Sequence, residues 1–421
     1  MKKFAALLLT LILCLTAVSA LAMEPVAKED LKIGAILVGD EYEGYTLAHM
    51  EGILAAARNL GLDESQIIWK RKIEENASCT TAAEDLFDQG CQIIISNSYG
   101  HQDYMNAAAE EFAGENVVFV AMTGDYAAIS GKDNFYNAFT KVFQSRYVSG
   151  VVAGMKVAEL VENGTISPEK TPNNFTADGK VKIGYVGAFP YAEVVSGYTA
   201  FFLGLRSIYP DAEMEVTYTN SWFDISAEAA AGEALVANGC VIVGQHADST
   251  GAPSALQKLL KDGTVCYSVG YNIDMLEVAP DAALTSPTNG WDKYYTDLFS
   301  AVINGEEVPQ DWAKGYEYDA VGITPLGASC APGTAEKVAE VEAALADGSL
   351  KVFDINTFTV GGETVTSAPV DLSYLDWSQG GAVVYAGETV EAIVDGAFAE
   401  SEFRAAPYFS LRIDGIIEDA Q

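Results

Sequence analysis

The sequence predicts an α/β protein made of two doubly wound lobes, each with a parallel sheet that is covered by helices on both faces. Short, continuous apolar runs alternate with stretches of helical apolar spacing, which is typical of parallel strands buried on both sides. The pattern then restarts, because the tripeptide KIG at 182–184 repeats KIG at 32–34 at the start of a strand. Two similar half-chains of domain length favour two lobes over one large sheet.

The first half of the chain predicts four strands with helices between them. The strands are expected at 32–38, 67–69, 91–95 and 117–121, and the helices at 44–60, 80–89 and 103–112. Gly61 follows the first helix at the position of a left-handed C-terminal cap. This order is that of one doubly wound lobe.

The second half begins with a long helix at 143–162, in which Gly150 and Gly154 would permit close packing. Further strands are expected at 182–186, 214–218, 241–244, 265–269, 283–286 and near 316–323, with helices at 290–303 and 335–346 among the later elements. The last stretch, 353–421, has alternating segments that indicate strands or extended pieces laid across a lobe.

We expect the chain to cross between the lobes three times, near 141–145, 270–276 and 310–316. The N-terminal lobe would then contain residues 31–143 and 273–312, and the C-terminal lobe residues 144–272 and 313–360. The remaining C-terminal extension, residues 361–421, receives no role from the sequence.

Residues 1–22 have the features of a cleaved signal peptide. Lys2 and Lys3 precede an apolar stretch at 4–15, and Ala-Leu-Ala at 20–22 fits signal peptidase. The apolar stretch is too short for a comfortable membrane span. We therefore expect an exported protein, either in the periplasm or on the outer face of the cytoplasmic membrane.

The composition is acidic, with 24 Lys and Arg against 59 Asp and Glu and a formal net charge of −35. Such a charge repels nucleic acid and anionic lipid, so neither is expected as a partner. Five of the six cysteines follow the signal peptide, and this odd number argues against a disulfide scaffold. Cys91, Cys240 and Cys266 lie in or beside apolar runs, where cysteine usually serves as a small core residue.

The sequence contains no recognisable catalytic or cofactor motif. Neither KIG strand leads into Gly-x-Gly-x-x-Gly, and the P-loop, Gly-x-Ser-x-Gly and His-Glu-x-x-His patterns do not occur. The three histidines, His49, His101 and His246, have no metal-ligand spacing. No catalytic residue, metal or cofactor is therefore expected.

Aromatic and polar residues follow the predicted strands in both halves, and ligands of open α/β sheets bind beyond the carboxyl ends of the strands. Facing rings can sandwich a flat heterocycle, while carboxylates and amides read its edge, so a planar, nitrogen-rich ligand fits better than a sugar. A single aromatic here is as often a lid on the core, and an aspartate can simply cap a helix, as we expect for Asp224. The candidate ligand-binding residues are Tyr45, Tyr99, Phe189, Trp222, His246, Asp248, Asn272 and Asp274.

Several stretches resemble the basic membrane protein family of ABC-transporter substrate-binding proteins, in particular its purine-binding members. They are NAFTKVFQSRYVSGVVAG at 137–154, KIGYVGAFPYAEVVSGYTAFFLG at 182–204, residues 216–248, and the Gly-aromatic-Thr-x-Ala-His loop at 44–49. The resemblance covers about 31–360 and implies a type I periplasmic-binding-protein fold with a hinge. It also implies a purine base or nucleoside as ligand and a membrane permease as partner. We expect a monomer.

The resemblance implies stacking by Tyr45, Tyr99 and Phe189, a pocket wall at Trp222, and polar contacts from the remaining four candidates. The nucleoside-binding branch carries a Lys after a Thr-Ser strand end to hold ribose, whereas Ser286 is followed here by Pro287. This departure favours a free base over its nucleoside.

Two other functions stay open. An exported nucleoside-cleaving hydrolase is disfavoured because no acid, base or nucleophile set is recognisable. A ligand-sensing partner of a membrane receptor cannot be separated from a transport protein by the sequence.

Overall fold

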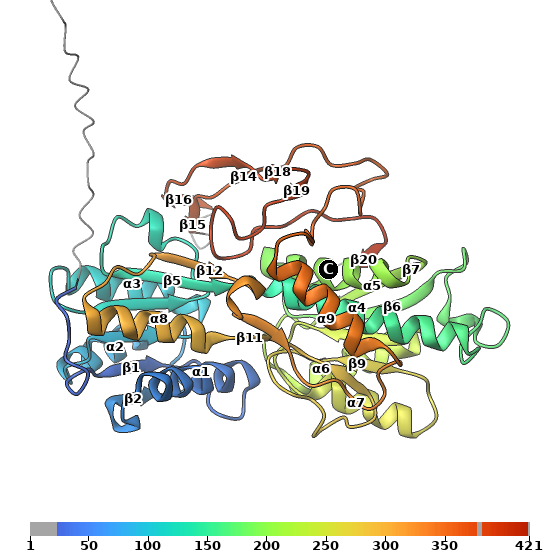
Figure 1. Ribbon diagram of the computed structural model, residues 1–421, viewed down its shortest axis with the longest axis horizontal. Helices are drawn as coiled ribbons and strands as arrows, with labels where there is room; N and C mark the ends of the chain where they lie inside the picture. The colour runs from blue at the N-terminus through green and yellow to red at the C-terminus, as the bar shows by residue number, and fades with distance from the viewer. Residues whose placement is uncertain (1–22, 377–380, 420–421) are drawn as a thin grey trace, which may run out of the picture.

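The computed structural model describes residues 23–376 and 381–419 and shows two lobes, each built on a six-stranded sheet (Figure 1). The predicted signal peptide at residues 1–22 lies outside the described residues. All strand pairs within the two sheets are parallel, so the predicted α/β class with two doubly wound lobes is confirmed.

The first lobe has helices on both faces of its sheet. In spatial order the strands are β12 (Asp311–Lys314), β5 (Phe135–Thr140), β4 (Val118–Met122), β3 (Ile93–Ser96), β1 (Ile33–Ile36) and β2 (Ile67–Lys70). Helices α1 (Gly44–Leu60) and α8 (Trp291–Asn304) pack on one face, and α2 (Ser78–Asp88) and α3 (Gln102–Glu111) on the other. Gly61 caps α1 at a φ of 62°, as the sequence predicts.

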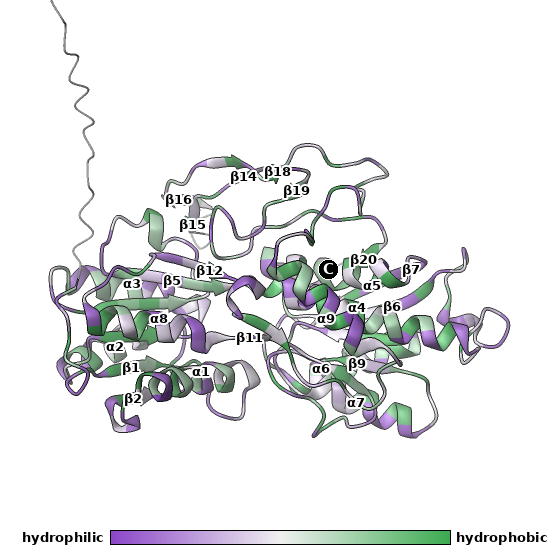
Figure 2. Ribbon diagram, viewed as in Figure 1, coloured by the Kyte–Doolittle hydropathy of each residue, from purple (hydrophilic) through white to green (hydrophobic). Residues whose placement is uncertain are grey.

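The second lobe repeats this arrangement. Its strands, in spatial order, are β10 (Ala283–Thr285), β9 (Tyr267–Val269), β8 (Ile242–Gln245), β6 (Val181–Gly187), β7 (Ala212–Tyr218) and β20 (Ile416–Glu418). Helices α4 (Val142–Glu162), α5 (Ala192–Ile208) and α9 (Thr334–Ala346) belong to one core, and α6 (Ile225–Ala237) and α7 (Gly251–Lys261) to the other. The central strands and inner helices are largely hydrophobic, as Figure 2 shows.

Strand β5 was not predicted, because a polar residue interrupts its apolar run. Asn137 is buried, and its side-chain oxygen accepts a hydrogen bond from the backbone N–H of Ala127 at 2.7 Å. Its amide donates to the Gly124 carbonyl at 3.2 Å. The side chain of Asn137 therefore ties the loop after β4 to β5, together with the backbone hydrogen bond from Thr123 to Ala138.

The second crossing between the lobes is wrongly predicted at 270–276. Strand β10 pairs with β9 and thus keeps residues up to Thr285 in the second sheet. The chain crosses at β11 (Pro287–Asn289), which pairs in antiparallel fashion with β13 (Val321–Ile323) after β12. The strand expected near 316–323 is therefore shorter, and a 3-10 helix at Tyr316–Tyr318 precedes it. The first crossing is at Lys141, between β5 and α4.

The C-terminal extension, residues 361–421, contacts both lobes rather than one. Its short strands are β14 (Pro369–Asp371), β15 (Tyr374–Asp376), β16 (Ala382–Tyr385), β17 (Thr389–Glu391), β18 (Ile393–Val394) and β19 (Ala397–Phe398), followed by β20. They pair as β14–β17, β15–β16 and β18–β19, all antiparallel. In Figure 1 this segment runs along one side of both lobes, and it ends in the second sheet.

Helices α4 and α5 are in backbone contact, as the glycines of α4 predict. A Cβ atom added at Gly150 would lie 1.9 Å from the carbonyl oxygen of Phe201, and one at Gly154 would lie 2.6 Å from that of Leu205. Neither distance is sterically allowed, so only glycine permits this separation of the helices. The N-terminal end of α4, which emerges from the first crossing, is thereby fixed against the second lobe.

We predict that Gly150→Ala destabilises the protein. Alanine gains roughly 1 kcal/mol of helix propensity over glycine, whereas forcing two packed backbones apart costs roughly 1–3 kcal/mol, so the packing cost should exceed the gain. Urea unfolding should show a lower midpoint for this variant. Gly322→Ala is the control, because the nearest atom to its Cβ would be Thr288 Oγ1 at 3.8 Å. Equal midpoints for Gly150→Ala and wild type would contradict the argument.

Candidate ligand-binding site

Tyr45, in the first turn of α1, is held in place from two sides. Its hydroxyl donates to the carbonyl of Asn97, beyond the end of β3, at 2.5 Å. Its ring meets the edge of the His49 ring with centroids 4.6 Å apart, and His49 in turn stacks on Trp291 of α8 at 4.5 Å. Burial lowers the pKa of His49 to about 3, so this histidine is a neutral packing residue.

The two lobes approach each other closely at the N-terminus of α1. A Cβ atom at Gly44 would lie 3.3 Å from the backbone oxygen of Asp248 and 3.3 Å from the side chain of Ile273. Both of these residues follow strands of the second sheet. Three candidates from the two lobes, Tyr45, Asp248 and Asn272, therefore converge on one region.

Asp248 is a buried carboxyl, 6% exposed. The Asn272 amide donates to its Oδ1 at 2.7 Å, and its backbone N–H donates to the Trp222 carbonyl at 2.8 Å. Burial raises the pKa of Asp248 well above its usual value, and the carboxylates of Glu43 and Glu193 raise it further. A ligand with N–H donors would stabilise the charged carboxylate of Asp248 by hydrogen bonds.

The hydrogen bonds of Asn272 continue to the hinge. Asn289 of β11 donates to Asn272 Oδ1 at 3.3 Å, and Thr140 at the end of β5 donates to Asn289 Oδ1 at 2.5 Å. Asn272 has a φ of 63°, a left-handed conformation that asparagine tolerates better than most residues. The candidate site is thus connected to two of the three crossings.

His246 is fully buried in the second lobe. Its Nε2 lies 2.8 Å from Glu193 Oε1, and its ring centroid lies 5.2 Å from that of Tyr271. Burial, together with the nearby charge of Arg146, lowers its pKa to about 4 against the attraction of Glu193. His246 is therefore neutral at neutral pH and offers a fixed hydrogen-bonding edge rather than a charge.

Arg146 of α4 lies beneath this region with a relative exposure of 1%. Its Nη1 donates to the Tyr185 hydroxyl and to the Gln245 carbonyl, both at 2.6 Å. The guanidinium stacks on the Tyr271 ring, with Cζ 3.8 Å from the centroid. Its Nε and Nη2 have no hydrogen-bond partner among the described residues.

The aromatic candidates of the second lobe form a cluster. The ring centroids of Phe189 and Trp222 lie 5.3 Å apart in an edge-to-face arrangement, and Tyr191 stacks on Phe189 at 5.1 Å. Because Trp222 is bonded through its backbone to Asp248, the cluster adjoins the buried carboxyl. Tyr191 is half exposed, at 53%.

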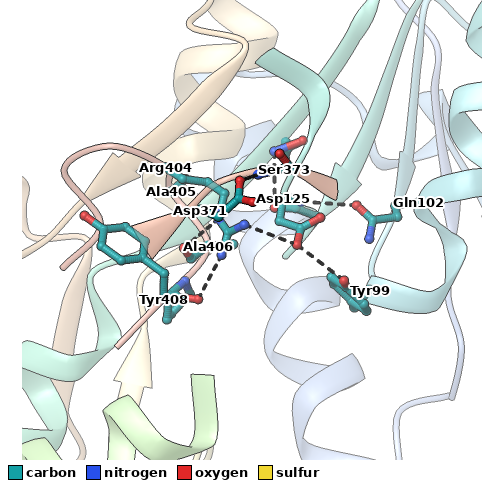
Figure 3. Close-up of polar contacts among 12 residues, drawn as sticks. Tyr99, Gln102, Asp125, Asp371, Ser373, Arg404, Ala405, Ala406 and Tyr408 are labelled. Atoms are coloured by element: carbon teal, nitrogen blue, oxygen red, sulfur yellow. Dashed lines mark hydrogen bonds and ion pairs between the residues drawn. The ribbon is translucent and has the colours of Figure 1, made fainter. Parts of the chain in front are cut away.

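None of the hydrogen bonds, ring pairs or ion pairs among the described residues joins Tyr99 or Asp274 directly to this group. Tyr99 is 46% exposed and donates to Asp125 Oδ2 at 3.4 Å (Figure 3). Asp274 is exposed, and its carboxylate accepts from the Leu276 backbone at 2.8 Å.

Asp224 caps α6, as predicted, by accepting from the backbone N–H of Ser226 and Ala227. A cavity of about 530 Å³ lies elsewhere, between Lys141, Phe143, Glu317 and the extension, and none of the eight candidates lines it.

Sequence reasoning missed Arg146, Glu193 and Tyr271. Arg146 and Glu193 stand inside the conspicuous stretches at 137–154 and 182–204, and Tyr271 directly follows a predicted strand. A lone arginine in a helix that is otherwise buried along most of its length is a signal that could have been used. Its partners, by contrast, come from β6, β8 and the loop after β9, and their proximity is not visible in the sequence.

Two lobes joined by three crossings, with polar and aromatic strand ends facing each other, define a bilobal solute-binding protein. Residues 38–346 match the family model for Bmp, the ABC transporter substrate-binding protein PnrA-like family. The chain belongs to this family and is a substrate-binding protein of an ABC transporter, with a small-molecule ligand and a membrane permease as partners. The family consists of binding proteins rather than enzymes.

Two curated relatives are similar over most of their length. A purine-binding protein of Brucella abortus (strain 2308) is 31% identical over 331 residues, which cover 78% of this chain and 84% of the relative. A putative ABC transporter glucose-binding protein of Haloferax volcanii is 27% identical, covering 70% of this chain and 68% of the relative.

Solved structures share the fold at low sequence identity. A solute-binding protein of an ABC transporter from Conexibacter woesei has a TM-score of 0.59 at 17% identity, covering 76% of this chain and 98% of that chain. A transcriptional activator from Bacillus halodurans also has a TM-score of 0.59, at 16% identity, with 76% and 99% covered. Within residues 23–376 and 381–419, no helix has the length and apolarity that a membrane crossing needs.

The burial of His246 predicts an acid-sensitive contribution to stability. The unfolded histidine takes up a proton near pH 6.5, whereas the folded one resists protonation down to about 4, so stability is lost as the pH falls between these values. The full shift of the His246 pKa corresponds to roughly 3 kcal/mol in the free energy of unfolding. Unfolding free energies measured from pH 7 to 4 should fall less steeply for His246→Gln than for wild type. His49 and His101 serve as an internal control, because they are unchanged in both proteins; parallel pH profiles would contradict the prediction.

Proposed function

We propose that this chain is an exported, monomeric binding protein that carries a purine base or nucleoside to its permease. It would act in the periplasm or on the outer face of the cytoplasmic membrane. The observation that carries the proposal is the buried carboxyl of Asp248, which lies between the lobes beside Tyr45 and Asn272. A purine presents ring N–H and amine donors to a carboxylate and acceptors to an amide. The purine-binding relative from Brucella abortus supports this assignment.

The proposed contacts divide into rings and edges. Tyr45, Phe189 and Trp222 would cover the faces of the heterocycle, each ring pair contributing on the order of 1 kcal/mol beyond the area buried. Asp248, Asn272 and His246 would read its edge. Tyr99 and Asp274, which lie apart from this group, would join it only as outer contacts.

The lining near the hinge favours a free base. The residue after the Thr285-Ser286 strand end is Pro287, and the side chain of Asn289, two residues further on, is already bonded to Thr140 and Asn272. No cation in this segment is available to hold the two hydroxyls of a ribose. A free base should therefore lose little affinity by lacking the ribose.

We predict that adenine, guanine or hypoxanthine binds at least as tightly as its nucleoside, and that glucose and amino acids bind negligibly. Titration calorimetry with the purified protein tests this directly. Asp248→Asn should weaken purine binding tenfold or more, because it leaves ligand donors unpaired at a cost of roughly 1–3 kcal/mol.

Asp262→Asn is the matched comparison, because that residue is exposed at the C-terminal end of α7 and should leave the affinity unchanged. A wide advantage for nucleosides would overturn the choice of a base, and binding of glucose without purine would overturn the purine assignment. Incubation with inosine or adenosine, followed by product analysis, distinguishes the alternative hydrolase. Pull-down of a receptor in place of a permease would favour the sensing role.

We also predict that the ligand closes the hinge. The candidates come from both lobes, and the connecting hydrogen bonds run through the crossings, so binding should draw the lobes together. Solution scattering should give a smaller radius of gyration when saturating purine is added. Addition of glucose serves as the control, and an unchanged profile with calorimetrically demonstrated binding would refute closure.

A further inference from the structure

The C-terminal extension, residues 361–421, is anchored firmly in the second lobe. Strand β20 pairs with β7 at the edge of the second sheet, and Glu418 accepts hydrogen bonds from the hydroxyls of Tyr198 at 2.7 Å and Tyr218 at 3.0 Å. Phe398 and Phe409 are buried in the core of that lobe. The extension lies beyond residue 346, where the family match ends.

The same extension reaches the first lobe through its β15–β16 hairpin. The Tyr374 hydroxyl donates to the Asp103 carboxylate at 2.9 Å, and the Asn106 amide donates to the Tyr385 hydroxyl at 2.9 Å. Both rings pack on Tyr126, with centroids 4.2 and 5.0 Å away. These contacts come from α3 and the loop after β4, which belong to the first lobe.

Nearer the hinge, the segment Arg404–Ala406 lies between the two lobes. The Arg404 guanidinium is 3.6 Å from Asp125 Oδ2, and both side chains are only 15% exposed (Figure 3). The backbone N–H of Ala405 donates to Asp311 Oδ2 of β12 at 2.8 Å. Ala405 and Ala406 also belong to the same buried hydrophobic cluster as Tyr271, which is part of the candidate site in the second lobe.

Asp125 links this segment to a predicted ligand contact. The Tyr99 hydroxyl approaches the same carboxylate oxygen, Oδ2, that faces Arg404. The only cation within ion-pair distance of Asp125 among the described residues is thus supplied from outside the family-matched region. A buried carboxylate that loses its partner becomes costly, so Arg404 stabilises the geometry of Asp125 and Tyr99.

We propose that Arg404 is a positioning residue of the ligand site and that its pairing with Asp125 is an interlobe latch, which must break when the cleft opens. Asp125 moves with the first lobe, whereas Arg404 lies in a loop whose flanking residues Phe398 and Phe409 are buried in the core of the second lobe. Glu400 closes this loop, because its carboxylate accepts from the backbone of Tyr408 and Phe409. A hinge rotation that separates the strand ends therefore pulls the pair apart. The latch biases the protein toward the closed form and slows release of the ligand.

This inference rests on the hinge closure proposed above, but its first test needs no ligand. Interlobe distances in the full-length, ligand-free protein can be measured by scattering or by fluorescence transfer between labels on α2 and α7. Arg404→Gln should shift the ligand-free ensemble toward open forms, and Arg404→Lys should restore much of the closed population. With saturating purine, all variants should reach the same compact state.

Arg412→Gln is the matched control. Arg412 is also an arginine of the extension, but its partner is Glu418, 2.5 Å away within the second lobe, so this pair does not cross the cleft. A merely structural effect would lower the unfolding midpoint of either variant without changing the open population. Only Arg404→Gln should change the interlobe distance.

The second test is kinetic. Loss of a partly buried pair should speed dissociation of a bound purine by about three- to tenfold, with a smaller effect on association. If Arg404→Gln folds poorly, Asp125→Asn removes the other charge, and raising the salt concentration should open wild type more than either variant. Unchanged ligand-free distances in Arg404→Gln and Asp125→Asn would overturn the latch, whether or not a purine binds. Failure of every purine to bind would overturn the ligand assignment alone.

Discussion

The burial of Arg146 is the interaction on which the rest of the molecule depends. Arg146 lies in the first turns of α4, after the first crossing. Its guanidinium bonds to Tyr185 of β6 and to the last residue of β8, and it stacks on Tyr271 after β9. A desolvated cation must be paired or hydrogen-bonded, so these groups are held in one arrangement. Gly150 and Gly154 serve the same purpose, because they let α4 lie against α5 closely enough for the side chain to reach its partners.

The electrostatics of the candidate site follow from this arrangement. Arg146 is the buried cation in a region that also holds Glu193 and Asp248, while burial keeps His246 neutral. The region thus holds two carboxyls against one cation. A neutral ligand with several N–H donors fits this balance, whereas an anionic ligand would add a further charge that is not compensated. The overall acidity of the chain acts in the same direction by repelling anions at long range.

The sequence predicted the features that depend on local order. Periodicity located α1 and most strands within a few residues, and the strand-end rule led to Tyr45, Asp248 and Asn272, which do converge. Prediction from the sequence failed where a contact between distant segments decides which sheet a strand joins or which side chains meet. Strand β10 stays in the second sheet because it pairs with β9, and Arg146 matters because three strands meet around it. The hydrophobic pattern of the extension has neither a clear helical nor a clear strand period, so its contacts with both lobes could not be predicted.

The path of the extension bears on the latch proposed above. Leu372 and Ala392 both lie in the core of the second lobe. Between them, β15 and β16 pack against the first lobe. The chain leaves that core a second time at Arg404 and returns by Phe409. Both segments are loops whose two ends are fixed in the second lobe. Much of their conformational entropy is therefore lost before any contact with the first lobe forms. Each contact then needs only modest strength to re-form quickly, as an intramolecular partner at high effective concentration. Under the proposed latch, weak contacts of this kind would hold the cleft closed and would still break when the cleft opens.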